Sequence, residues 1–146
     1  MAIAANRKSL QDRQRALVAE AFSAITEYRE YPYIVYRRDK LKKEEERTRI
    51  SSALSTLQSR INSLQAQLFV ETPFIADSYK SLVAATRKIA GPAIKMAWDS
   101  EPAGCDAEVS TSAYDTTQLE KPAQRFLKQA RRNFGWVPNW VYFLCD

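Results

Sequence analysis

The sequence predicts an all-α protein, a bundle of three or four helices forming a single domain over residues 1–146. The chain has only 3 glycines, whereas all-β folds use glycine in turns and bulges. Hydrophobic residues make up 45% of its 146 residues, enough at this length for a core without metals or disulfides. Leucine and isoleucine recur at alternating intervals of four and three residues from residue 50 onward, the spacing of helices that pair as coiled coils.

The first helix is expected over residues 9–31. Ser9 followed by Asp12 resembles a capping box at its start. Its apolar residues recur at helical spacing and form one face: Leu10, Leu17, Val18, Ala21, Phe22, Ile25 and Tyr28. Pro32 disfavours a helical conformation at the residue before it. We therefore expect a break or a kink there, with the first helix ending at residue 31 and residues 31–36 forming an apolar connector packed onto the bundle.

Residues 37–98 are predicted to form a long antiparallel coiled-coil-like helical hairpin. The charged segment 37–49 begins the second helix, whose seam is Ile50, Leu54, Leu57, Ile61, Leu64 and Leu68. Thr72 and Pro73 supply an N-cap and a proline at the first position of the third helix. The seam of the third helix is Ile75, Tyr79, Leu82, Thr86, Ile89, Ala93 and Met96. The alternative is one continuous helix, kinked at proline, that dimerises.

Two further segments complete the chain. Gly91 and Pro92 predict a kink or a restart in the third helix. Residues 99–116 are acidic, lack Lys and Arg, and have no helical period, which predicts a loop. Residues 117–146 are expected to form a C-terminal helix over 118–134 and an apolar tail. The apolar face of this last helix is Leu119, Ala123, Phe126, Leu127, Ala130 and Phe134, with Gly135 as its C-terminal cap.

The composition argues against catalysis and against a bound cofactor. The chain contains no histidine, the commonest general base near neutral pH and the commonest metal ligand. Three scattered glycines cannot build a phosphate-binding loop. Two distant cysteines, Cys105 and Cys145, are too few for a Cys₄ zinc site. We expect no enzyme activity, no metal, no cofactor and no small-molecule substrate.

The sequence also bears on location. No segment approaches the roughly 20 apolar residues that a membrane span needs, and the N-terminus becomes charged too early for a signal peptide. The net charge is +5, a modest basic excess spread along the chain apart from the acidic loop. We expect a cytoplasmic protein without peripheral membrane contact.

The first candidate binding surface is the outer face of the second helix. Arg60 is the only charged residue between Ile50 and Val70, whereas exposed helix faces usually carry Glu and Lys. The residues away from the seam are small and polar: Ser52, Ser55, Thr56, Ser59, Asn62, Ser63 and Ala66. One interpretation is a face for a protein partner or a homodimer. The other is that the first or last helix packs there.

The second candidate is a basic stripe on the third and last helices. Its residues are Lys80, Arg87, Lys88, Lys95, Lys121, Arg125, Lys128, Arg131 and Arg132. Such a stripe suits a nucleic-acid backbone or an acidic partner. The simpler interpretation is that these charges keep a helical protein soluble.

The third candidate is the apolar tail. Its large side chains are Trp136, Trp140, Tyr142, Phe143 and Leu144. They could pack on the chain's own bundle, enter a partner's groove or contact a membrane surface. Long amphipathic helices without catalytic groups indicate a non-enzymatic protein–protein interaction module: a small adaptor, regulator or complex subunit. The alternative function is nucleic-acid binding through the basic stripe.

Overall fold

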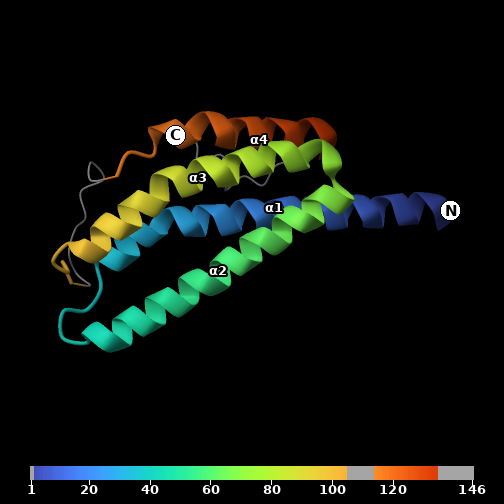
Figure 1. Cartoon of the computed structure of the whole chain (residues 1–146). Coiled ribbons are helices and arrows are strands. Elements are labelled where there is room, and N and C mark those ends of the chain that lie inside the picture. The colour runs from blue at the N-terminus through green and yellow to red at the C-terminus, as the bar shows by residue number, and fades with distance from the viewer. Residues whose placement is uncertain (1, 105–113, 135–146) are drawn as a thin grey trace.

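The computed structural model describes residues 2–104 and 114–134. These residues form four α-helices, one short 3-10 helix and no strand, which confirms the all-α prediction. The elements are α1 (Ala2–Tyr36), α2 (Lys43–Glu71), α3 (Pro73–Asp99), η2 (Thr117–Leu119) and α4 (Glu120–Phe134). Successive α-helices run in opposite directions, and the start of α1 projects beyond the other helices (Figure 1). Within the described residues, no helix is both long and apolar enough to cross a membrane.

The predicted end of the first helix at Pro32 is wrong. α1 begins at Ala2, so Ser9 and Asp12 lie inside it, and it continues through Pro32 to Tyr36. Proline removes one backbone donor and crowds the preceding turn, which disfavours a helix. Here Pro32 is buried together with Tyr31 and Val35. Continuing the helix places these side chains in the core, and their burial outweighs the local preference.

The break between α2 and α3 falls where the sequence predicts it, but Thr72 acts differently. Pro73 is the first residue of α3, as expected. The Thr72 hydroxyl makes no cap bond to α3 and instead donates to the Leu68 carbonyl at 3.1 Å. The backbone N–H of Thr72 donates to the same carbonyl at 2.8 Å. Thr72 therefore satisfies an acceptor that the end of α2 would otherwise leave unpaired.

The coiled-coil pairing of α2 with α3 is not confirmed. The two helices diverge from the turn at Thr72, and α1 packs against both of them (Figure 1). They remain in contact as far as Gln58 and Arg87, whose side chains are hydrogen-bonded to each other. The first half of α3 buries its predicted seam residues Ile75, Tyr79, Leu82 and Thr86. Its second half buries Ala90, Ile94 and Ala97, while the predicted seam residue Met96 is 67% exposed. A straight helix drifts away from a seven-residue repeat, so the buried face of α3 moves off the predicted seam.

Other boundaries also differ from the prediction. α2 begins at Lys43, not at Arg37. α3 runs without interruption past Pro92, whose side chain is exposed. Leu10, expected on the buried face of the first helix, is 48% exposed because the start of α1 extends past the rest of the bundle (Figure 1).

An aromatic cluster joins α1, α3 and α4. The Phe126 ring of α4 is fully buried, with its centroid 6.2 Å from Phe22 of α1 and 5.3 Å from Tyr79 of α3. The Tyr79 hydroxyl donates to the Ala21 carbonyl of α1 at 2.9 Å. The predicted apolar face of the last helix is thus confirmed, and its exposed face is left to carry the charges of α4.

The described ends of the acidic loop lie against the end of α1. The backbone N–H of Ala103 donates to the Tyr36 carbonyl at 2.8 Å. Tyr114 is buried, and its ring centroid lies 5.6 Å from that of Tyr33. The predicted loop is therefore attached to the bundle at both described ends. Its middle, residues 105–113, lies outside the described residues.

Buried tyrosines make the fold sensitive to alkaline pH, and burial raises the pKa of Tyr28 and Tyr31. Burial raises the pKa of Tyr114 to about 12 and raises the pKa of Tyr79 further. The unfolded chain loses these protons near pH 10 while the folded chain keeps them. We expect the free energy of unfolding to be maintained below pH 10 and to fall above it, by about 1.4 kcal/mol per pH unit for each tyrosine. Urea denaturation between pH 9 and about pH 11 measures this slope, and Tyr79→Phe should reduce it by the contribution of one tyrosine.

Candidate functional site

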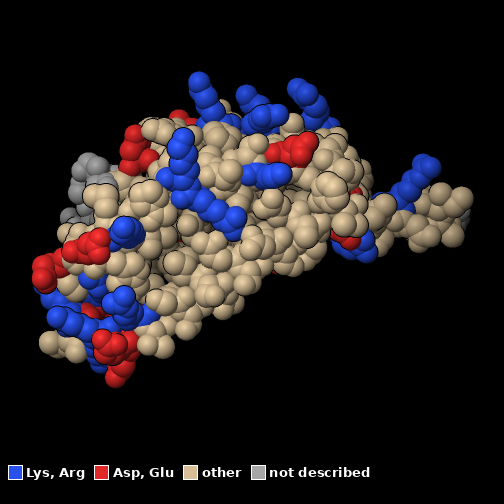
Figure 2. All heavy atoms as spheres, viewed as in Figure 1, with Lys and Arg blue, Asp and Glu red and all other residues tan. Residues whose placement is uncertain are grey.

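The outer face of α2 is exposed along most of its length. No described helix covers Ser52, Ser55, Thr56, Ser59, Asn62, Ser63 or Ala66. The interpretation that the first or last helix packs there is therefore wrong for the described part of the chain. Beyond its charged start, α2 appears as a band without blue or red atoms on the face drawn in Figure 2.

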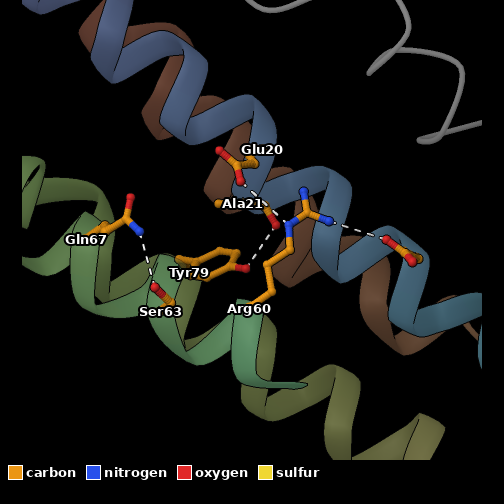
Figure 3. Close-up of polar contacts among 7 residues, drawn as sticks. Glu20, Ala21, Arg60, Ser63, Gln67 and Tyr79 are labelled. Atoms are coloured by element: carbon orange, nitrogen blue, oxygen red, sulfur yellow. Dashed lines mark hydrogen bonds and ion pairs between the residues drawn. The ribbon is translucent and has the colours of Figure 1, made fainter. Parts of the chain in front are cut away.

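The single cation on this length of α2 is directed toward α1. The Arg60 guanidinium lies 3.6 Å from a Glu20 carboxylate oxygen and 3.5 Å from one of Glu27, both on α1 (Figure 3). On the exposed side, the Gln67 amide donates to the Ser63 hydroxyl at 3.2 Å (Figure 3). The outer face therefore presents hydroxyls, amides and small apolar groups, with its one charge neutralised at the edge.

This neutral face ends at an apolar patch beside the turn. Phe69 and Val70 are 71% and 77% exposed. They border an open groove of about 490 Å³ between α2 and α3, which is lined by Asn62, Gln65, Ala66, Phe69, Val70, Ala76, Asp77 and Lys80. This patch is not among the surfaces that the sequence predicts. The sequence did contain a signal for it. Phe69 and Val70 are large apolar residues that directly follow Leu68, the last seam residue, but do not belong to the seam.

The structure divides the predicted basic stripe. Arg87 does not point outward with the others: it donates to the side-chain Oε1 of Gln58 at 3.0 Å and to the side-chain Oδ1 of Asn62 at 2.8 Å, both on α2. Lys80 lines the groove between α2 and α3. Lys88 and Lys95 are exposed on α3. Arg87 therefore belongs to the contact between α2 and α3, and the prediction that it joins an outward stripe is wrong.

The cations of α4 remain together. Lys121, Arg125, Lys128, Arg131 and Arg132 are all exposed. Four of them line one shallow hollow along the helix with Gln124 and Gln129. In Figure 2, blue side chains project in a series from the edge of the molecule formed by α4. We call these five residues the α4 row.

The end of α4 is held against α1 and α3. Arg15 donates to the Phe134 carbonyl at 2.6 Å, and the Phe134 ring centroid lies 6.4 Å from that of Phe74. The predicted cap Gly135 and the candidates Trp136, Trp140, Tyr142 and Phe143 lie outside the described residues. The last described residue of α4 therefore lies beside the turn between α2 and α3.

The chain was compared with family models, with curated proteins and with solved structures. Nothing matches.

The acidic side chains of the described residues offer no metal site. No group of three or more His, Cys, Asp or Glu side chains in that part of the chain could hold an ion. At the start of α2, Arg49 and the backbone N–H of Asp39 bond to the Glu46 carboxylate and lower its pKa. A carboxylate held in its ionised form by a cation is suited to an ion pair rather than to proton transfer.

Proposed function

We propose that this chain is a non-enzymatic protein–protein interaction module that assembles through the outer face of α2. The observation that carries the proposal is an exposed, uncharged helix face that ends in exposed Phe69 and Val70. Large apolar side chains at the rim of a groove are typical anchors of protein interfaces. Small side chains beside them allow the backbone of a second helix to approach closely.

A second copy of this chain is the occupant that the charges favour. The chain has a net charge of +5, so two copies repel each other wherever their cations meet. Between Ile50 and Val70 the α2 face carries one cation of its own, Arg60, which is bound to Glu20 and Glu27 of α1. Residues Ser52, Thr56, Ser59, Ser63 and Ala66 also follow a spacing of four, three, four and three. That spacing keeps small side chains in line for a paired helix.

Charge placed on this face should abolish the association. We expect the mass of the native chain in solution to rise from the 16.7 kDa of one copy toward twice that value as concentration increases. The double variant Ser55→Arg with Ser59→Arg should stay at the mass of one copy at every concentration, because the interface would then bury unpaired cations. Light scattering at micromolar and millimolar concentrations measures this, and circular dichroism reports that the helices are retained.

The matched control places the same charges elsewhere. Ser23 on α1 and Ser81 on α3 are also exposed serines, so Ser23→Arg with Ser81→Arg makes an equal change in net charge. This control should associate like the native chain. A native chain that remains a single copy at millimolar concentration, or a control that also fails to associate, would contradict the proposal.

A further inference from the structure

Solubility alone does not explain the arrangement of the α4 row. Lys121, Arg125, Lys128 and Arg132 are separated by four, three and four residues, so each cation stands beside the next on one side of the helix. Like charges at these spacings destabilise a helix, whereas alternating Glu and Lys would stabilise it and give the same solubility. The only acidic residue of α4 is Glu120, at its first position.

The helix dipole accounts for only part of this row. Cations in the last turn of a helix interact favourably with its negative end, and Arg131 and Arg132 lie there. Lys121 lies in the first turn, near the positive end, where the same dipole disfavours a cation. The cations in the first half of the row therefore lower the stability of α4.

Nothing in the described chain neutralises the row. Its five side chains make no ion pair and no side-chain hydrogen bond with another described residue, whereas four cations of α1 and α2 are paired. Those pairs are Arg13 with Glu71, Arg15 with Asp12, Arg49 with Glu46, and Arg60 with both Glu20 and Glu27. Five neighbouring cations without a partner among the described residues are available to an anion from another molecule.

We infer that the α4 row binds the phosphate backbone of double-stranded nucleic acid without reading its sequence. From Lys121 to Arg132 the row extends about 16 Å along a straight helix, which suits a backbone of closely and regularly spaced charges. Lys88 and Lys95 of the neighbouring α3 are exposed and unpaired within the described residues, and they extend the positive surface.

The surroundings of the row favour a duplex over the other polyanions. Single strands are held by exposed aromatic rings on which bases stack, and the aromatic rings of α4, Phe126 and Phe134, are buried. Anionic membranes are bound by helices that also insert an apolar face, and the apolar face of α4 is occupied by α1 and α3.

The test is salt-dependent binding of a labelled 20-base-pair DNA duplex of arbitrary sequence, followed by fluorescence anisotropy. Five phosphate contacts predict a slope of log K against log salt of about −4.5. Arg125→Gln with Lys128→Gln removes two contacts and should reduce the slope to about −2.7. The control is Arg7→Gln with Lys8→Gln, two exposed cations on the projecting start of α1, which makes the same change in net charge. Binding by the control should match that of the native chain.

Each other outcome overturns the inference. If the duplex does not bind at 50 mM salt, the row is no phosphate site. If the control loses as much affinity as the α4 variant, net charge alone drives the binding. If phosphatidylserine vesicles bind and the duplex does not, the row faces a membrane. If an oligo-glutamate peptide binds and the duplex does not, the ligand is an acidic protein.

Discussion

Phe126→Ala is expected to lower the free energy of unfolding by about 4 kcal/mol, as for other fully buried phenylalanines. The Phe126 ring is the only side chain of α4 in ring contact with both α1 and α3, through Phe22 and Tyr79. Its removal leaves a cavity that the stiff surrounding helices can fill only partly. Since small domains unfold at a total of roughly 5–15 kcal/mol, the variant should unfold at a much lower urea concentration.

Phe74→Ala is the matched control for this variant. Phe74 contacts Phe134 near the end of α4 but is 51% exposed, so its truncation removes less buried surface and should cost about 1 kcal/mol. Urea denaturation followed by circular dichroism compares the two variants. Equal losses in stability would show that α4 is not held to the bundle through Phe126.

Arg38→Ala is expected to lower the free energy of unfolding by about 3 kcal/mol, the range for hydrogen bonds from a charged donor. The Arg38 guanidinium donates to the carbonyls of Ala97 and Ser100 at 2.8 Å and of Trp98 at 3.2 Å, at the end of α3. It also donates to Val35 near the end of α1 and lies 5.1 Å from the Trp98 ring. One side chain thus satisfies acceptors that the end of α3 leaves unpaired and fixes that end to α1.

Two variants separate this role from general charge effects. Arg37→Ala removes the same charge from the neighbouring residue, which is exposed and makes no described side-chain bond; it should change stability by less than about 0.5 kcal/mol. Arg38→Lys should recover only part of the loss, because a compact ammonium cannot reproduce the planar fork of donors. Amide exchange in the last turn of α3 should quicken in Arg38→Ala alone. Full recovery by lysine would contradict the proposed role of Arg38.

The sequence predicts which residues make up the candidate surfaces, but not which of them have partners or how exposed they are. The missing charge on the second helix and the cations of the last helix are visible in the sequence, and the structure exposes both. Which cations have partners is a property of the packing. Arg60 reaches α1, and Arg87 reaches Gln58 and Asn62 of α2, because neighbouring helices place acceptors beside them. The exposure of Phe69 and Val70 likewise depends on how α2 and α3 diverge at the turn.

The sequence by itself determined the helical class, the break at Pro73 and the apolar faces of the first and last helices. Each of these depends on interactions within one or two turns of the chain, which residue type and spacing control directly. The tertiary structure alone decided that α1 passes through Pro32, that the buried face of α3 shifts toward Ala90 and Ile94, and that α1 packs against both α2 and α3. These features depend on burial shared among several helices. The free energy of that burial exceeds a local preference of a few kcal/mol at one proline or one heptad position.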